Sequence, residues 1–340
     1  MNYHHVFGID MGTGQVKIYD QADDTIKKEM NMIAVRNKNT VFAVGNDAYD
    51  MYEKTPENIE IITPMGSGRI NNVLMMEAVL HTLLGRTAGS VGMSPILYFS
   101  VPVDMTEIER RAYTTIACKG RFRKAKVFMV EKPIADAITF GIPLQTTEGC
   151  ILVNIGAQCT EVSVIADKRV IFSNTIPVGG QTFSTAIVEG IRRKNNFLVS
   201  TRTAQRLKIT LTSLDEEVHE GCKVIGIDTT NGLPRDGIVS SANVSACVEE
   251  KVEEIVSELI RILERIPPQV RLSALSKGLY FTGGSMRIPG IREYFSYRLG
   301  CPIIVSGHYE MSTIYGLKEI INNDRLQHWV YIPGKKTRER

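Results

Sequence analysis

Two segments that lie far apart in the chain follow the same residue pattern. In the first, Asp10 stands two positions before Gly12, and an alternating apolar stretch follows the glycine turn. In the second, Asn154 stands two positions before Gly156, and a similar stretch follows. Each segment is typical of a strand, a tight turn and a second strand. Self-similarity at this separation indicates a duplicated domain with a boundary near residues 146–149.

The remainder of the chain alternates predicted strands with predicted helices. Residues 96–101 and 126–130 are short apolar runs of the kind found in strands. Between them, residues 106–118 are predicted to be helical, with Thr106 as the N-cap and acidic residues in the first turn. The longest predicted helix covers residues 245–266, carries its apolar residues on one face and is ended by two prolines. This alternation predicts an α/β fold, and 340 residues are enough for about two domains.

Composition and charge exclude several classes of protein. The 40 basic and 37 acidic residues give a net charge of +3, too even for the basic surface that binds nucleic acid. The six cysteines contain no CxxC pair, which predicts reduced, mostly buried thiols and excludes a zinc knuckle. No apolar run approaches the roughly 20 residues of a transmembrane helix. Because a strand begins soon after Met1, without a signal peptide, we expect a cytoplasmic protein.

Three glycine turns, each after a predicted strand, are candidates for phosphate binding. They are Gly12–Gly14, the turn at Gly156, and Gly283–Gly284. Short glycine turns expose backbone N–H groups that can cradle phosphate oxygens. A strand follows the first turn, so the dinucleotide fingerprint does not apply, and the chain has no P-loop motif. Convergence of the three turns in a cleft between two lobes predicts a single nucleotide site.

With these glycine turns, the chain resembles the MreB/Mbl family of bacterial actin-like, cell-shape-determining proteins, within the actin, heat-shock chaperone and sugar-kinase superfamily. The similarity extends over residues 7–322. Residues 8–14 resemble the family's first phosphate loop, and residues 281–284 resemble its adenosine motif. Further MreB-like signatures lie at residues 55–56, 64–65, 101–102, 109–112, 202–208, 232–235 and 267–268.

The resemblance implies an α/β, actin-like ATPase fold. Two duplicated ribonuclease-H-like domains, each with a small inserted subdomain, would enclose a nucleotide cleft. The first domain is expected at residues 1–146, with its small subdomain at 33–66. The second is expected at residues 147–340, with its small subdomain at 182–244. A C-terminal helix from about residue 311 would pack back on the first domain.

The resemblance also implies a function. The protein would bind ATP and Mg²⁺ and polymerise with itself into double protofilaments on the inner face of the cell membrane. There the filaments would organise cell-wall elongation and rod shape together with membrane proteins of the elongation machinery. The family is a slow ATPase in which hydrolysis governs filament disassembly.

Site residues follow from the family's motifs. Asp10 would hold the magnesium through water, with Asn154 as a weak second contact. Gln205 and Lys208 would lie near the ribose. The remaining expected nucleotide contacts are Gly12, Thr13, Gly14, Gln15, Gly156, Ala157, Gln158, Cys159, Gly180, Gly283, Gly284, Ser285 and Met286.

The chain departs from the family pattern at the residue that would activate water. The family has a catalytic glutamate immediately before Pro133, whereas this chain has Lys132 there. A protonated lysine cannot accept the proton of the attacking water, although it can attract the γ-phosphate. Glu131 is a possible substitute after a small register shift, but neighbouring residues of an extended segment point in opposite directions. We therefore expect slow or absent hydrolysis, since general acid–base catalysis contributes about 10²–10⁴-fold.

Other departures remove acidic groups or glycines from the motifs. Asn154 replaces an aspartate, which removes a charge that would help to hold a hydrated metal. Ala157 and Gln158 place side chains where bare backbone would approach the phosphates. Gln181 occupies a position where the family has an aspartate, and Gln205 one where it has a glutamate. Ser285 replaces a glycine of the adenosine motif.

Membrane attachment is expected from a small apolar loop that carries Val91 and Met93. Basic residues between 119 and 126, and the tail at 335–340, would also favour anionic lipid, although a solvated surface is the preferred explanation for both.

Two other functions stay open for a chain with these departures. A small-molecule kinase of the same fold would need a catalytic carboxylate and room for an acceptor-binding insertion, which 340 residues scarcely provide. A non-polymerising, ATP-sensing adaptor is compatible with the degenerate loops. A variant of this second function is a passive subunit carried in the filaments of a paralogous MreB protein.

Overall fold

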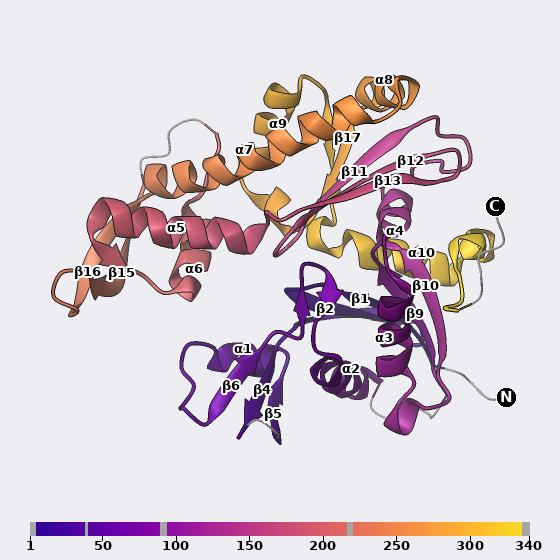
Figure 1. Cartoon of the computed structure of the whole chain (residues 1–340), viewed down its shortest axis with the longest axis horizontal. Helices are drawn as coiled ribbons and strands as arrows, with labels where there is room; N and C mark the ends of the chain where they lie inside the picture. Colours follow the sequence, from indigo (N-terminus) through magenta and orange to yellow (C-terminus); the bar gives the residue numbers. More distant parts are fainter. Residues whose placement is uncertain (1–4, 38–39, 89–93, 216–219, 335–340) are drawn as a thin grey trace. The chain divides into compact units, whose positions relative to one another are not determined.

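The computed structural model describes residues 5–37, 40–88, 94–215 and 220–334. The chain divides into two compact units, which Figure 1 shows as a ribbon coloured along the sequence. Unit 1 consists of Met1–Leu144 and Glu310–Arg340, and unit 2 consists of Gln145–Tyr309.

A five-stranded sheet forms the centre of unit 1. Its strand order is β10-β9-β1-β2-β3. The strands β1, β2 and β3 are antiparallel neighbours, whereas β9 and β10 run parallel to β1. Consecutive residues of β1, including Phe7, Ile9 and Met11, are fully buried, as expected for a central strand covered on both faces. The bounds are β1 (Val6–Met11), β2 (Gln15–Asp20), β3 (Thr25–Met30), β9 (Ile96–Val101) and β10 (Lys126–Glu131).

The central sheet of unit 2 repeats this topology. Its strand order, β18-β17-β11-β12-β13, matches that of unit 1 strand for strand. Again the first three strands in the sequence are antiparallel neighbours and the last two run parallel to the first. The duplication predicted from the two glycine hairpins is therefore confirmed. The bounds are β11 (Cys150–Ile155), β12 (Thr160–Ala166), β13 (Arg169–Ile176), β17 (Leu279–Thr282) and β18 (Ile303–Val305).

Each unit also carries a small antiparallel sheet (Figure 1). In unit 1 its order is β5-β4-β6, with α1 packed beside it and a short hairpin of β7 and β8 following. In unit 2 the order is β14-β15-β16. The bounds are β4 (Ile33–Arg36), β5 (Thr40–Val44), α1 (Asn46–Met51), β6 (Ile59–Ile62), β7 (Met65–Gly66), β8 (Arg69–Ile70), β14 (Phe197–Leu198), β15 (Gly221–Asp228) and β16 (Pro234–Ser240).

Helices cover the central sheets. Those of unit 1 are α2 (Val73–Ala88), α3 (Glu107–Ala117), α4 (Lys132–Thr139) and α10 (Ser312–Asn322). Those of unit 2 are α5 (Gly180–Asn195), α6 (Thr201–Leu211), α7 (Ser241–Arg265), α8 (Pro268–Lys277) and α9 (Ile291–Leu299). Short 3₁₀ turns occur at Gly120–Phe122, Gly284–Arg287, Tyr309–Met311 and Asp324–Trp329.

Local sequence signals explain where two of these helices begin. Thr106 caps α3 in a capping box: its hydroxyl accepts from Glu109 N at 3.2 Å, and its own N–H donates to Glu109 Oε2 at 2.7 Å. Helix α7 starts earlier than predicted because Ser240 is its N-cap and accepts from Asn243 N at 3.4 Å. It ends at Arg265, and Ile266 is its C-cap residue before the proline pair.

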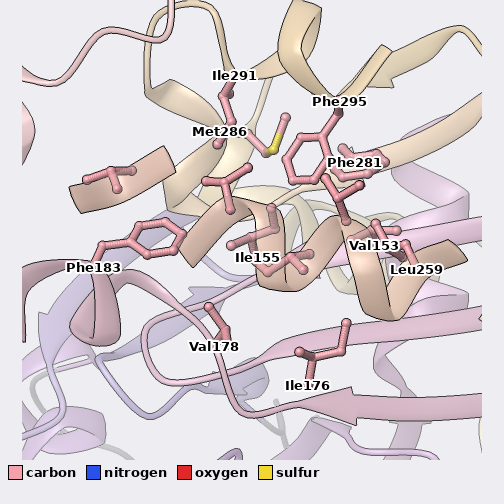
Figure 2. Packing of buried hydrophobic residues seen from close by; sticks show 14 of the residues in the cluster. Val153, Ile155, Ile176, Val178, Phe183, Leu259, Phe281, Met286, Ile291 and Phe295 are labelled. Carbon is pink, nitrogen blue, oxygen red and sulfur yellow. The ribbon is translucent and has the colours of Figure 1, made fainter. Parts of the chain in front are cut away.

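The apolar stripe of α7 packs into the core of unit 2. Figure 2 shows this core, in which Val153 and Ile155 of β11 lie among Phe281, Phe295 and Leu259. All five side chains are at most 1% exposed. The predicted apolar face of the longest helix is thus its buried face.

Helix α10 packs against α4 within unit 1. A Cβ atom on Gly316 would lie only 1.9 Å from Ala135 O, so glycine is required for the two backbones to approach this closely. Two side-chain bonds hold the same pair: Thr139 Oγ1 donates to Ser312 O at 2.7 Å, and Thr313 Oγ1 donates to Asp136 Oδ1 at 2.7 Å.

Candidate functional site

The first glycine turn, Gly12–Gly14, joins β1 to β2. Gly12 N donates to Gln15 O at 2.9 Å, which closes the turn. Asn31 fixes the loop from outside, because its side-chain amide donates to Gly12 O at 2.8 Å and its backbone N–H donates to Gly14 O at 3.0 Å. Sequence reasoning missed Asn31, since a single asparagine between two methionines carries no recognisable signal.

Thr13 also belongs to this loop and is buried. Its hydroxyl oxygen accepts from Gly68 N at 3.0 Å, which ties the loop to the β7–β8 hairpin. A hydroxyl that accepts a hydrogen bond still has its own proton to donate, so Thr13 retains the capacity to bind an anion.

Asp10 is the last polar residue of β1 before the turn, and both of its carboxylate oxygens accept hydrogen bonds. Lys17 Nζ lies 2.9 Å from Oδ2, and Ser100 Oγ donates to Oδ1 at 2.7 Å. Burial alone would raise the pKa of Asp10, but the positive charges of Lys17 and Lys132 outweigh it and hold this pKa below its usual range. Asp10 is therefore ionised and enclosed by cationic groups.

Lys17 and Ser100 were not predicted as site residues. Lys17 faces Asp10 across the β1–β2 hairpin. Ser100, on the parallel strand β9, is also a register partner of Asp10. The signal for Lys17 was present, because directly opposite residues of a tight hairpin lie on the same face. Ser100 depends on a parallel pairing between distant segments, which the sequence does not specify.

Lys132 and Glu131 stand at the junction of β10 and α4, and they face different groups. Lys132 is 8% exposed, and its charge acts on Asp10. Glu131 is enclosed elsewhere: burial raises the pKa of its carboxyl, and Arg110 is the charge that acts against this rise. Burial, with the Glu131 charge next in importance, raises the pKa of Tyr331 to about 12. The charge of Lys132 thus acts on Asp10, whereas the charge of Glu131 interacts with Arg110 and Tyr331.

The second glycine turn, between β11 and β12, has the same backbone bond as the first. Gly156 N donates to Cys159 O at 2.9 Å. Asn154 and Glu161 face each other across this hairpin, as Asp10 and Lys17 do across the first.

The N-terminal turn of α5 lies against this second loop. Gly180 N donates to Gly156 O at 2.9 Å, and Gln181 N donates to Ala157 O at 2.6 Å. A Cβ atom on Gly179 would lie 2.8 Å from Cys159 N, so the residue before the helix must be glycine. The structure thus brings the predicted residues of both segments together.

Lys208 reaches this loop–helix junction from α6. Its ammonium donates to Gly180 O at 2.5 Å and to Ser184 Oγ at 3.1 Å. Burial lowers the pKa of Lys208 to about 8. Ser285 is also close, since a Cβ atom on Gly180 would lie 3.5 Å from its hydroxyl oxygen. Gln205 is partly buried on the preceding turn of α6.

The third turn, Gly283–Gly284, meets the end of β11. Gly283 has φ +100°, and a Cβ atom there would lie 2.3 Å from Ile155 O, so both conformation and space require glycine. Met286, two residues beyond the turn, is 4% exposed and packs in the core beside Phe295 (Figure 2). Only its backbone is left for the predicted nucleotide contact.

The residues around Asp10 do not fit a divalent cation. Magnesium in proteins is held by one or two carboxylates and keeps several waters, whereas the oxygens of Asp10 already accept from Lys17 and Ser100. Across residues 5–37, 40–88, 94–215 and 220–334, His, Cys, Asp and Glu side chains form no group of three that would hold a metal.

Some predicted features lie elsewhere. Val91 and Met93, with the basic tail at 335–340, are outside the described residues. Among the helices of the described part of the chain, each is too short or too polar to cross a membrane.

Comparisons with known proteins agree on one family. The family model described as MreB/Mbl protein matches residues 4–328. The cell shape-determining protein MreB of Escherichia coli (strain K12) is 32% identical over 307 residues, which cover 88% of each chain. The cell shape-determining protein Mbl of Bacillus subtilis (strain 168) is 29% identical, over 88% of this chain and 90% of its own.

Solved structures show the same fold. MreB5 of Spiroplasma citri bound to AMPPNP superposes with a TM-score of 0.88 at 24% identity, over 95% of this chain and 97% of its own. The MamK double helical filament superposes with a TM-score of 0.76 at 15% identity, over 94% of this chain and 99% of its own. The actin-like fold predicted from the motifs is therefore confirmed.

Proposed function

The chain belongs to the MreB/Mbl family, and we propose that it binds ATP and assembles with copies of itself into cytoskeletal filaments that determine cell shape. The observation that carries the proposal is the pair of glycine hairpins with the same backbone bond, from Gly12 N to Gln15 O and from Gly156 N to Cys159 O. Each presents a tight, glycine-bearing turn at the end of a central strand, a geometry suited to phosphate oxygens.

Nucleotide binding is supported by the polar groups around these hairpins. Unit 1 offers Thr13 and the cationic groups next to Asp10, and unit 2 offers the loop at Gly156, Lys208 and Ser285. MreB5 of Spiroplasma citri was solved with AMPPNP and with ADP, and a nucleoside triphosphate is the ligand we assign here. The family resemblance adds Mg²⁺, which stays a prediction.

Hydrolysis is proposed to be slow. A general base must reach the attacking water, and the residue at the family's glutamate position is Lys132, which acts on Asp10 as a positive charge. Glu131 lies beside Arg110 and Tyr331. Since general-base catalysis contributes about 10²–10⁴-fold, a filament of this chain would keep its ATP for long periods.

Filament formation is supported by the relatives. MamK, with the same fold, forms a double helical filament, and the curated relatives are cell shape-determining proteins. We assign to this chain double protofilaments at the inner, cytoplasmic face of the membrane, acting with membrane proteins of cell-wall elongation.

A passive role within the filaments of a paralogous MreB protein is the second candidate. The observation that favours it is Lys132, because a subunit that cannot hydrolyse ATP gains turnover only from active neighbours. A small-molecule kinase is less well supported, since its catalytic carboxylate is missing at the same position.

Electron microscopy of the purified protein tests the proposal. We expect paired straight filaments with ATP, and none without nucleotide, and we expect anionic liposomes to recruit them. Folded monomers in every condition would contradict self-assembly, and co-sedimentation with an active MreB protein would then identify the passive subunit. Rapid phosphate transfer to a panel of small acceptors would instead identify a kinase.

A further inference from the structure

The charges buried around Asp10 are arranged unlike a metal site. Asp10, Lys17 and Lys132 are 3%, 7% and 8% exposed, so solvent screens their interactions weakly. Lys17 Nζ contacts one carboxylate oxygen directly, at 2.9 Å, and Ser100 occupies the other. A water of a hydrated cation would therefore have to share these oxygens with an ammonium group and a hydroxyl.

The second lysine adds to the repulsion of a cation. The charges acting on Asp10 are those of Lys17 and Lys132, so two ammonium groups surround one carboxylate. Asp136, on the same helix as Lys132, accepts from Thr313 Oγ1 at 2.7 Å. A divalent ion brought to Asp10 would therefore be repelled by both ammonium groups.

The hairpin of unit 2 has no carboxylate at the position that corresponds to Asp10. Asn154 occupies the place that Asp10 has in unit 1, and an amide holds Mg²⁺ far less strongly than a carboxylate. Gln158 and Gln181 are neutral as well. Glu161, which faces Asn154, is the one acidic residue of the sequence between 150 and 166.

We propose that Lys17 and Lys132 supply the positive charge that a divalent cation would otherwise supply, so that this chain binds the phosphates of its nucleotide without metal. This inference rests on the proposed function, because it specifies how that nucleotide is held. An ammonium group is a compact charge with three donors and is suited to phosphate oxygens. Lys17 sits on the strand that leaves the first loop, and Lys132 begins the helix that follows β10.

Calorimetric titration of the full chain with ATP separates the possible outcomes. It is performed once with an excess of Mg²⁺ and once with EDTA. We expect dissociation constants within about threefold of each other in the two buffers. Binding that requires Mg²⁺ would overturn this inference alone, whereas no binding in either buffer would overturn the proposed function and this inference with it.

Charge-altering variants test which residues replace the metal. K132E is expected to weaken binding in EDTA by at least about tenfold and to recover when Mg²⁺ is added. The matched control is K223M, because Lys223 is an exposed lysine of unit 2 paired with Asp236 at 2.5 Å, and its loss should change neither measurement. Equal metal-free binding by K132E and the unaltered chain would contradict the role of Lys132.

Lys17 needs a variant that keeps the core intact. K17M alone leaves the buried Asp10 carboxylate without its partner, so the double variant D10N/K17M removes both charges together. Thermal unfolding first establishes that it folds, and we then expect at least about tenfold weaker binding in EDTA. If it binds ATP as tightly as the unaltered chain, Lys17 does not hold the phosphates.

The metal content of the complex gives an independent readout. Mn²⁺ reports by electron paramagnetic resonance whether a cation stays with the bound nucleotide. We expect well below about one bound Mn²⁺ per nucleotide at saturation. One tightly bound Mn²⁺ per nucleotide would show that the site holds a cation in spite of the two lysines.

Discussion

The hairpin of unit 1 and the hairpin of unit 2 close with the same hydrogen bond, 2.9 Å long in each, and occupy the same place in sheets of the same strand order. Their facing side chains differ. Asp10 faces Lys17 in unit 1, where Asn154 faces Glu161 in unit 2. The two hairpins thus share the backbone geometry of the turn and differ in the charges on the flanking strands. The two hairpins therefore share a fold but present different charged groups to a ligand.

The supports of the two loops differ as well. In unit 1 the side-chain amide of Asn31 holds the loop together with the backbone N–H of the same residue. In unit 2 the loop is held by backbone N–H groups of Gly180 and Gln181, at the start of a helix. A side-chain support is removed by one substitution, whereas a backbone support is not.

The largest expected difference concerns the paired charges. K17M leaves Asp10 ionised and buried, and removing one partner of a buried ion pair typically costs about 3–5 kcal/mol. E161Q in the other hairpin is expected to cost no more than about 1 kcal/mol, because Asn154 is neutral. Urea unfolding followed by circular dichroism measures both. A similar loss in the two variants would show that the hairpins are equivalent after all.

Hydrolysis offers the next comparison, between adjacent residues that face different groups. K132E restores a carboxylate beside Asp10 and is expected to raise phosphate release in Mg²⁺ by about 10²-fold. E131Q, the matched variant, should leave the slow release unchanged, because Glu131 lies beside Arg110. If E131Q abolishes the residual release instead, Glu131 is the base.

Lys208 of unit 2 makes nucleotide binding depend on pH. Lys208 bonds only to neutral acceptors in the contacts described above, and burial lowers its pKa to about 8. A bound polyphosphate favours the charged lysine, so above pH 8 binding must take up a proton. ATP affinity should then fall about tenfold between pH 7.5 and 9.5.

Titration calorimetry in two buffers of different ionisation enthalpy detects the proton taken up. The dependence should disappear in K208M and persist in K223M, whose lysine is exposed and paired. If K208M keeps the dependence, the titrating group is not Lys208.

The smallest expected effect concerns the loop supports. N31A removes the amide bond to Gly12 O and should destabilise unit 1 by about 1–3 kcal/mol. T182A removes a hydroxyl that accepts from Gly179 N at 2.9 Å and should cost about 1 kcal/mol in unit 2. Thermal unfolding measures both, and a larger loss in T182A would contradict the assigned supports.

Local signals allowed much of the fold to be predicted. Strand β9 has the bounds expected from its apolar run, and Thr106 caps α3 as predicted. The glycine turns were found because close backbone approach leaves few alternatives to glycine, as at Gly283. The strand and the helix cap depend on residues that are near one another in the sequence.

Two of the missed residues reach the site from other strands. Ser100 reaches Asp10 only because β9 lies parallel to β1, and Asn31 reaches the first loop from the end of β3. Met286 was assigned to the nucleotide from its motif, yet its side chain fills the core beside Phe295. A motif identifies a segment, whereas the direction of each side chain is set by packing.

The contact of Gly316 with Ala135 has a practical consequence for work on this protein in cells. Helix α4 begins with Lys132, and its opposite side is held by α10 through Gly316 and Thr313. A side chain larger than glycine at position 316 would therefore strain the packing of α10 on α4, the helix that begins with Lys132. A labelling residue is better placed in an exposed turn such as the one at Gly307, where no atom lies within 4 Å of an added Cβ.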